Sequence, residues 1–275
     1  MEPHFARIHQ RVGLIFEEMK NHAPLDNLRG DYAGMAPDWT VPQHLDFYSD
    51  EDQAVWRLLV GRQSALAREF ACAEFLQGLE TLGIGDSIPD FEAVNAKLEP
   101  LTGWRVVGVP GLIPDAAFYD HLAHRRFPVT VWIRKRSELD YLVEPDLFHD
   151  FFGHVPLLSN PVFADYMQLY GQRGVEAGSE IDRLARLYWY TVEFGLIRTT
   201  PDSKGGLKIY GAGILSSASE VRHAIEGAGV ERRPFQAATV MRQPYQIDKL
   251  QGTYFVLDDF RQLFEAAEQF SLPTN

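Results

Sequence analysis

The sequence holds a single cysteine, Cys72, so no disulfide can form within the chain. Such sparse cysteine usage is typical of a reducing compartment, and we expect a cytoplasmic protein. The first residues, MEPHFARIHQ, lack the basic and then apolar build of a secretory signal peptide. No apolar run approaches the roughly 20 residues that a membrane-spanning helix needs.

Positive charge is also scarce. Lysine and arginine total 26 against 38 aspartates and glutamates, which gives a formal net charge of −12. Nucleic acids and anionic membranes are bound by basic surfaces, so this balance argues against both kinds of partner. The 275 residues contain no low-complexity run and no linker rich in proline, glycine or serine. We therefore expect one folded globular domain.

Hydrophobic periodicity predicts a mostly helical fold. Apolar residues recur at helical spacing in five segments, residues 5–20, 50–82, 88–100, 114–126 and 181–198. Two short segments rich in β-branched and aromatic residues, 104–110 and 127–133, predict strands. Residues 207–222 and 252–270 each combine a short strand with a helix. The predicted class is mostly α with small β strands (α+β).

The segment EPDLFHDFFGHVPLL, residues 144–158, places two histidines in an apolar run. Pro145 suits the first turn of a helix, and Gly153 suits its end. Five residues turn an α-helix through roughly 140°, so His149 and His154 would not share a helix face. We expect them to meet because the helix stops near Gly153. The spacing is not that of the HExxH zinc motif. The alternative is that the two histidines are unrelated, one exposed and one hydrogen-bonded in the core.

Glu193 is the candidate third ligand. It lies in LARLYWYTVEFGLI, which is apolar nearly all round and is therefore expected to be buried. An unpaired ionised carboxylate in such a place is costly, so either a metal or a distant arginine or lysine must compensate it. Two histidines and a carboxylate form the ligand set of non-haem Fe(II) oxygenases. Zinc hydrolases use the same ligand types, so both classes remain open.

Other clusters carry weaker signals. His121 and His124 are three apart on an expected helix, but the adjacent Arg125 and Arg126 favour a solvated face over a metal site. The segment GAGILSS, 211–217, lacks the lysine of a phosphate-binding loop and favours a tight glycine turn. No GxSxG motif is present, so nucleophilic catalysis has no support.

Three motifs, EPDLFHDFFGHVPLL, RLYWYTVEFGLI and YGAGILSS, occur in this order and spacing. Together they resemble the pterin-dependent aromatic amino acid hydroxylases, and most of all their short bacterial phenylalanine 4-hydroxylases. The resemblance covers about residues 45 to 270. It implies a catalytic domain at 46–275, preceded by an N-terminal helix and loop extension at 1–45.

The resemblance also implies roles for single residues. His149, His154 and Glu193 match the family's iron ligands, and no further catalytic residue is implied. Arg134 matches the arginine that grips the substrate carboxylate, a role that suits the guanidinium fork. Asp146 matches an acid that holds the arginine region and the iron ligands in place. The remaining substrate-side positions are Tyr141, Trp189, Ser216 and Ile247, and the pterin-side positions are Leu112, Ile113, Phe118, Asp150 and Tyr188.

Two of these positions qualify the match. Ile247 is apolar where the animal tyrosine hydroxylases carry aspartate, which favours phenylalanine over a phenolic substrate. Asp150 stands where the animal enzymes carry glutamate, so this pterin-side position departs from the animal pattern. Glu220, with Tyr188, matches positions around the pocket.

The implied activity is that of a phenylalanine 4-monooxygenase, which converts L-phenylalanine to L-tyrosine with Fe(II), O2 and tetrahydrobiopterin or a similar tetrahydropterin. Alternatives within the same chemistry are tryptophan hydroxylation and attack at another ring position. A zinc hydrolase is the remote alternative. The sequence shows neither a regulatory domain nor a terminal heptad helix of the animal kind. We therefore expect a monomer without phenylalanine-driven allostery.

Overall fold

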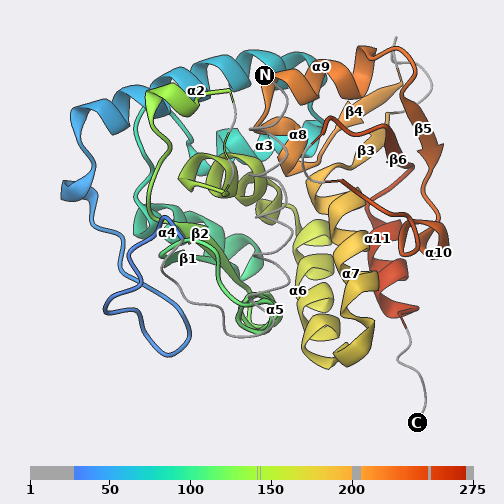
Figure 1. The fold of residues 1–275 in the computed structure, drawn as a ribbon, viewed down its shortest axis with the longest axis horizontal. Coiled ribbons are helices and arrows are strands. Elements are labelled where there is room, and N and C mark those ends of the chain that lie inside the picture. Colours follow the sequence, from blue (N-terminus) through green and yellow to red (C-terminus); the bar gives the residue numbers. More distant parts are fainter. Residues whose placement is uncertain (1–27, 141, 143, 200–205, 247–248, 271–275) are drawn as a thin grey trace, which may run out of the picture.

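A computed structural model of the chain describes residues 28–140, 142, 144–199, 206–246 and 249–270. The helix predicted for 5–20 and the positions Tyr141 and Ile247 lie outside these described residues. Helices are the main element (Figure 1). Their bounds are α2 Asp50–Phe70, α3 Ala73–Leu82, α4 Phe91–Thr102, α5 Asp115–Ala123, α6 Pro161–Glu176, α7 Ile181–Tyr188, α8 Ala212–Leu215, α9 Ala218–Glu226, α10 Ala237–Val240 and α11 Arg261–Glu268. No described helix is long and apolar enough to cross a membrane.

The helix predicted over 50–82 is divided into α2 and α3. A capping box at Ser49 starts α2, since Ser49 and Asp52 satisfy each other's backbone N–H groups. The break comes at Ala71, which forms a β-bridge with Ile209, and Cys72 N donates to Ile209 O at 2.9 Å. The prediction of one continuous helix is wrong because a tertiary backbone pairing, rather than a local proline or glycine, ends α2.

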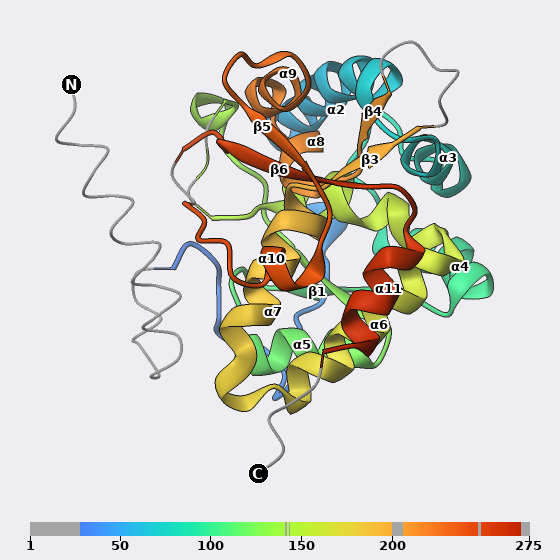
Figure 2. The same cartoon turned by 90° about the vertical axis from the view of Figure 1, so that its right-hand side faces the viewer.

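Two small sheets are built into the helical fold. Strands β1 Arg105–Val109 and β2 Arg126–Thr130 correspond to the predicted strands at 104–110 and 127–133, and they pair in parallel with α5 as their crossover. The second sheet has the order β4-β3-β6-β5. Its bounds are β3 Leu196–Arg198, β4 Leu207–Ile209, β5 Glu231–Pro234 and β6 Thr253–Leu257. Only the β3–β4 pair is antiparallel. Figure 2 shows this sheet beside α9 and α2.

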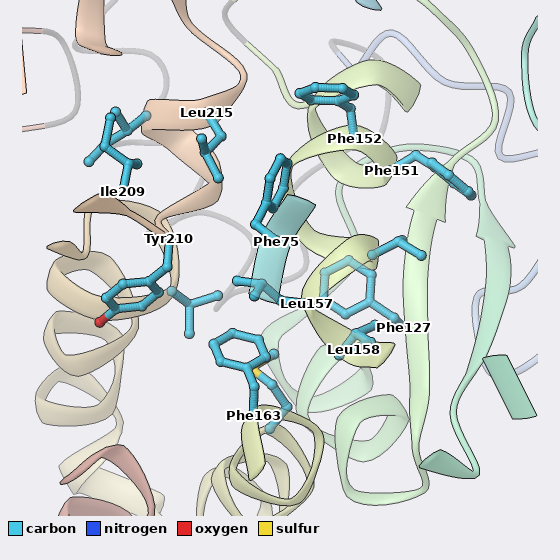
Figure 3. Close-up of a cluster of buried hydrophobic side chains, with 14 of the residues drawn as sticks. Phe75, Phe127, Phe151, Phe152, Leu157, Leu158, Phe163, Ile209, Tyr210 and Leu215 are labelled. Carbon is cyan, nitrogen blue, oxygen red and sulfur yellow. The ribbon is translucent and has the colours of Figure 1, made fainter. Parts of the chain in front are cut away.

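The apolar residues of 144–158 form part of the core. Phe148 and Phe152 are fully buried, and their rings lie 5.7 Å from Trp56 of α2 and Phe75 of α3, respectively. Figure 3 shows side chains of this segment, α3, α6 and the β4–α8 region pointing into one cluster. Burying a phenylalanine side chain contributes roughly 1.5–3 kcal/mol. The histidine-bearing segment is therefore held by its aromatic neighbours.

Helix α6, for which the sequence analysis made no prediction, packs closely on α5. A Cβ added at Gly174 would lie 1.8 Å from the Tyr119 ring, and one at Gly171 would lie 2.3 Å from Ala123 N. The two glycines therefore let the helix backbones approach each other. This packing sets the position of α5, which carries Phe118.

Candidate metal centre

His149 and His154 lie at the two ends of a π-helical turn, His149–His154, which continues into a 3-10 turn, Val155–Ser159. The predicted helix end near Gly153 is therefore wrong. In a π-helix the hydrogen bonds run from residue i to i+5, so residues five apart come close to the same face. The two imidazole centroids are 5.2 Å apart with planes at 80°. The wider turn brings the histidines together without ending the helix.

Gly153 serves packing instead of helix termination. It is not among the described glycines with positive φ, as a helix-ending glycine would be. A Cβ at this position would lie 3.0 Å from both the Cβ and the carbonyl oxygen of Ala212. The glycine thus allows α8 to approach the π-helical turn. Ser216, at the end of α8, then reaches His149, with its Oγ 2.9 Å from Nδ1.

Glu193 enters the site from a second π-helical turn, Trp189–Glu193, which follows α7. The predicted helix over 181–198 is thus shorter than expected and gives way to β3. Glu193 Oε1 lies 3.1 Å from His154 Nε2, and Oε2 lies 3.6 Å from His149 Nε2. A Cβ at Gly213 would lie 3.0 Å from Oε2. Gly213 therefore leaves room for this carboxylate, while a Cβ at Gly211 would lie 2.5 Å from the Glu193 backbone oxygen. Neither glycine has a positive φ, and the segment forms the short helix α8 instead of the tight glycine turn we predicted.

The surroundings of Glu193 favour the ionised form of its carboxylate. Burial opposes its ionisation, but the His154 and His149 rings outweigh burial and lower its pKa. No arginine or lysine forms an ion pair with it in the described part of the chain, where both of its partners are histidines. The distant cation that the sequence left open is thus absent from these residues.

A metal ion fits this arrangement. The three ligating atoms lie within 4.8 Å of one another. Ligands about 2.1 Å from a metal, at angles of 90–109°, are about 3.0–3.4 Å apart, close to the carboxylate–imidazole distances found here. Ser216 is a hydrogen-bond partner for the outer nitrogen of His149, as metal-bound histidines usually have. The two imidazoles and one carboxylate are the donor set of non-haem Fe(II) sites.

Asp146 accepts hydrogen bonds from both Arg134 and His149 and so links these two residues. Its Oδ2 accepts from Arg134 N at 2.8 Å and Nε at 2.9 Å. Its Oδ1 accepts from Arg134 Nη2 at 2.8 Å and from His149 N at 3.1 Å. Asp146 is fully buried and Arg134 is 6% exposed. Among the described residues, no acceptor is bonded to Arg134 Nη1. This nitrogen of the guanidinium group can therefore donate hydrogen bonds to a bound ligand.

Aromatic rings connect the predicted pterin-side positions to the histidines. The Phe118 ring lies 5.7 Å from Tyr188, which stacks on His154 at 6.1 Å. Asp150 accepts a hydrogen bond from Thr130 N at 2.9 Å, and burial raises its pKa. Leu112 and Ile113 lie in the short loop between β1 and α5, and Phe118 lies on α5.

The predicted substrate-side residue Trp189 is held by a residue that the sequence analysis missed. Trp189 Nε1 donates to Gln251 Oε1 at 3.1 Å, and its ring stacks on Tyr245 at 4.5 Å. Gln251 is buried, and its backbone N donates to Glu220 Oε1 at 3.2 Å. Gln251 thus links Glu220 to Trp189, the predicted substrate-side residue. No local pattern marks Gln251, because its role depends on contacts with segments distant in sequence.

The prediction that His121 and His124 lie on a solvated helix face is wrong for His121. His121 is 1% exposed, and its Nε2 lies 2.8 Å from Asp38 O, so it is not on a solvated face. The His124 side chain is 64% exposed, as expected. The only described group of three or more potential metal ligands is His149, His154 and Glu193.

Comparisons with known proteins identify the family. The model of the biopterin-dependent aromatic amino acid hydroxylases matches residues 29–274. The chain belongs to this family. It is 54% identical over 242 residues to a phenylalanine-4-hydroxylase of Mesorhizobium japonicum, which covers 87% of this chain and 86% of the relative.

Solved structures of Chromobacterium violaceum phenylalanine hydroxylase have the same fold. One, with bound iron(III) and oxidised cofactor 7,8-dihydrobiopterin, has a TM-score of 0.81 and 52% identity, covering 92% of this chain and 89% of that one. Another, with iron and phenylalanine bound, has a TM-score of 0.79 and 51% identity, covering 92% and 88%. The predicted family and fold class are both confirmed.

Proposed function

We propose that the chain is a phenylalanine 4-monooxygenase that converts L-phenylalanine to L-tyrosine with O2 and a tetrahydropterin at an Fe(II) site. The convergence of His149, His154 and Glu193 within 4.8 Å carries this proposal, because it supplies the two-histidine, one-carboxylate donor set. The name and bound ligands of the Chromobacterium violaceum relative support the choice of phenylalanine, iron and pterin. Family membership favours oxygen chemistry over the zinc hydrolysis that these ligand types also permit.

Iron and the reduced pterin, when bound, supply the activation of O2. The protein's own contribution is a set of donors whose positions are fixed by contacts within the chain. Ser216 holds the outer nitrogen of His149, which leaves Nε2 directed toward Glu193. His149, His154 and Glu193 would hold an iron ion by three protein ligands, which would leave coordination positions for O2, as an oxygen-activating site requires.

Arg134 is the residue that anchors the substrate carboxylate. Its Nε and Nη2 are committed to Asp146, so Nη1 is the edge presented to a ligand. Asp146 also fixes the backbone of His149, and the substrate anchor and an iron ligand therefore share one support. This common support sets the position of the substrate relative to the metal. Trp189 and Ser216 complete the substrate side, with Tyr141 and Ile247 as predicted members outside the described residues.

Phe118, Tyr188 and the backbone of Leu112 and Ile113 form the pterin side. Phe118 meets Tyr188 edge to face, and Tyr188 stacks on His154, so a chain of rings leads from Phe118 to the metal ligands. An offset stack on the Phe118 ring would hold a planar bicyclic cofactor at the outer end of this chain of rings. Asp150, next to His149 in the sequence, is fixed by the backbone N–H of Thr130.

A reconstituted assay tests the proposal. Purified protein should form L-tyrosine from L-phenylalanine only when ferrous iron, a tetrahydropterin and O2 are all present. Product analysis by hydroxyl position separates 4-hydroxylation from attack elsewhere on the ring, and tryptophan in place of phenylalanine tests the other substrate. Absence of any hydroxylated amino acid from the complete mixture would refute the proposal.

A further inference from the structure

Residues 28–41, here called the N-terminal strap, run alongside the two-stranded sheet. In Figure 1 this segment is the dark blue chain that lies near β1 and β2. Val41 N donates to Gly108 O of β1 at 2.9 Å. Asp38 is held twice, by His121 Nε2 on its carbonyl at 2.8 Å and by Arg126 Nη1 on its carboxylate at 3.1 Å. The strap is therefore fixed to the sheet at its C-terminal end.

The other end of the strap lies on the backbone of residues 110–113. Tyr32 donates its phenol hydrogen to Leu112 O at 2.8 Å. A Cβ added at Gly30 would lie 1.8 Å from Pro110 O, so the strap backbone touches the Pro110 carbonyl directly. A Cβ at Gly111 would lie 3.0 Å from the Tyr32 hydroxyl. Close packing and a hydrogen bond thus act on the same four-residue segment.

Arg29 locks this end of the strap in place. Its guanidinium carbon lies 4.5 Å above the Trp132 ring, and its Nη1 reaches both Glu138 oxygens at 3.0 and 2.9 Å. Trp132 in turn donates Nε1–H to Pro110 O at 3.0 Å. Arg29 N also donates to Glu144 Oε2 at 3.3 Å. The strap therefore connects the 110–113 segment to the start of the iron-ligand segment.

We infer that Tyr32 is a positioning residue for the tetrahydropterin, which acts by fixing the peptide plane between Leu112 and Ile113. The inference rests on the proposed function, in which this backbone borders the pterin. In a trans peptide the C=O and the following N–H point in opposite directions. With Leu112 O held by Tyr32, the Ile113 N–H faces away from the strap, and it has no acceptor among the described residues. Without the phenol, this peptide loses the one described hydrogen bond to its carbonyl, and only packing still restrains its rotation.

The protonation state of Tyr32 suits this role. Burial, with a smaller contribution from Glu144, raises the pKa of its phenol above the ordinary value. The hydroxyl therefore remains a donor at all working pH values, and the hydrogen bond to Leu112 does not titrate.

Tyr32→Phe tests the inference in the full-length, iron-loaded protein. The measurements are the KM values for tetrahydropterin and phenylalanine, kcat, Tm, and the affinity for 7,8-dihydrobiopterin by calorimetry. Loss of one hydrogen bond should weaken dihydropterin binding and raise the pterin KM by about three- to tenfold. The phenylalanine KM and the iron content should stay within about twofold. Gly30→Ala, which displaces the strap from Pro110, should raise the pterin KM at least as much.

Tyr48→Phe is the matched control. Tyr48 also donates its phenol to a backbone carbonyl, that of Val131, at 2.7 Å, but this acceptor lies outside 110–113. The Tyr48→Phe variant should bind the pterin with an affinity within about twofold of wild type. An unchanged pterin KM in Tyr32→Phe, or equal rises in the two KM values with a lowered Tm, overturns the inference while leaving the proposed function intact. Wild-type protein that binds no dihydrobiopterin overturns both.

Discussion

Replacing Asp146 with asparagine should damage stability and substrate binding together. The carboxylate of Asp146 accepts four hydrogen bonds, three from Arg134 and one from His149 N. In asparagine one oxygen becomes an NH2 group, so two of the four donors would face another donor. The Arg134 guanidinium, only 6% exposed, would also lose its counter-charge. Removing one partner of a buried ion pair costs about 3–5 kcal/mol.

This cost can be measured by denaturation. In proteins of 150–250 residues, 1 kcal/mol shifts Tm by about 2–4 °C, so a fall of about 10 °C is expected. Because the Arg134 fork is no longer fixed, the phenylalanine KM should rise by at least about tenfold, while the pterin KM changes less. The two assays are thermal unfolding of the purified protein and steady-state kinetics in which phenylalanine and pterin are each varied while the other is saturating.

Asp258→Asn is the control for this substitution. Asp258 pairs with Arg198 at 3.0 Å, but their side chains are 70% and 53% exposed. Such surface pairs contribute about 0–1 kcal/mol, so Tm should fall by no more than a few degrees. If Asp146→Asn costs no more than this control and keeps the wild-type phenylalanine KM, then Asp146 does not support Arg134 in the way the contacts indicate.

Three further changes test other parts of the site. Glu193→Gln, which keeps the shape but removes the charge, should reduce iron content at least tenfold on metal analysis, and normal iron loading would remove Glu193 from the ligand set. Gln251→Leu, which takes the partner from Trp189 Nε1, should raise the phenylalanine KM about threefold or more with unchanged iron content; Gln246→Leu on the same loop, which keeps that bond, is its control. Burial raises the pKa of Glu220, so its ionised form costs stability as pH rises above the ordinary carboxyl value. Glu220→Gln should therefore gain Tm relative to wild type as pH rises above the ordinary carboxyl pKa, and a Tm difference independent of pH would contradict this.

Much of the fold followed from local patterns. The strands at β1 and β2 and the helices α4 and α5 were predicted close to their observed bounds, because their apolar spacing and composition agree with their final environment. The break between α2 and α3 was not predictable in this way. It depends on the backbone pairing of Ala71 with Ile209, which lies far along the chain. His121 was misplaced for a similar reason, since its partner is the carbonyl of Asp38 in the strap.

The predicted site residues also differ in whether local sequence patterns or contacts between distant segments determine their positions. The sequence correctly predicted that His149 and His154 come together. It attributed this to the end of an α-helix, whereas the two residues lie in a π-helical turn. A π-helical turn differs from an α-helical one in its i+5 hydrogen bonds, not in a characteristic amino-acid composition. Sequence patterns therefore do not distinguish the two. The resemblance to a family included Glu193, Arg134 and Asp146 because a motif records tertiary geometry that periodicity does not. It included neither Gln251 nor Tyr32, whose contacts join sequence-distant segments.

Both ligand-bearing turns depart from α-helical geometry, and each is fixed by contacts from elsewhere in the chain. Ser216 and Asp146 hold His149 in the first turn, while Gly213 leaves space for Glu193 in the second. Such departures from local preference are expected where function, rather than stability, selects the conformation. A substitution that restores α-helical preference in either turn would rotate a ligand away from its partners. The geometry of the metal centre is thus a property of the packing between segments, and its supports are the residues most open to mutational test.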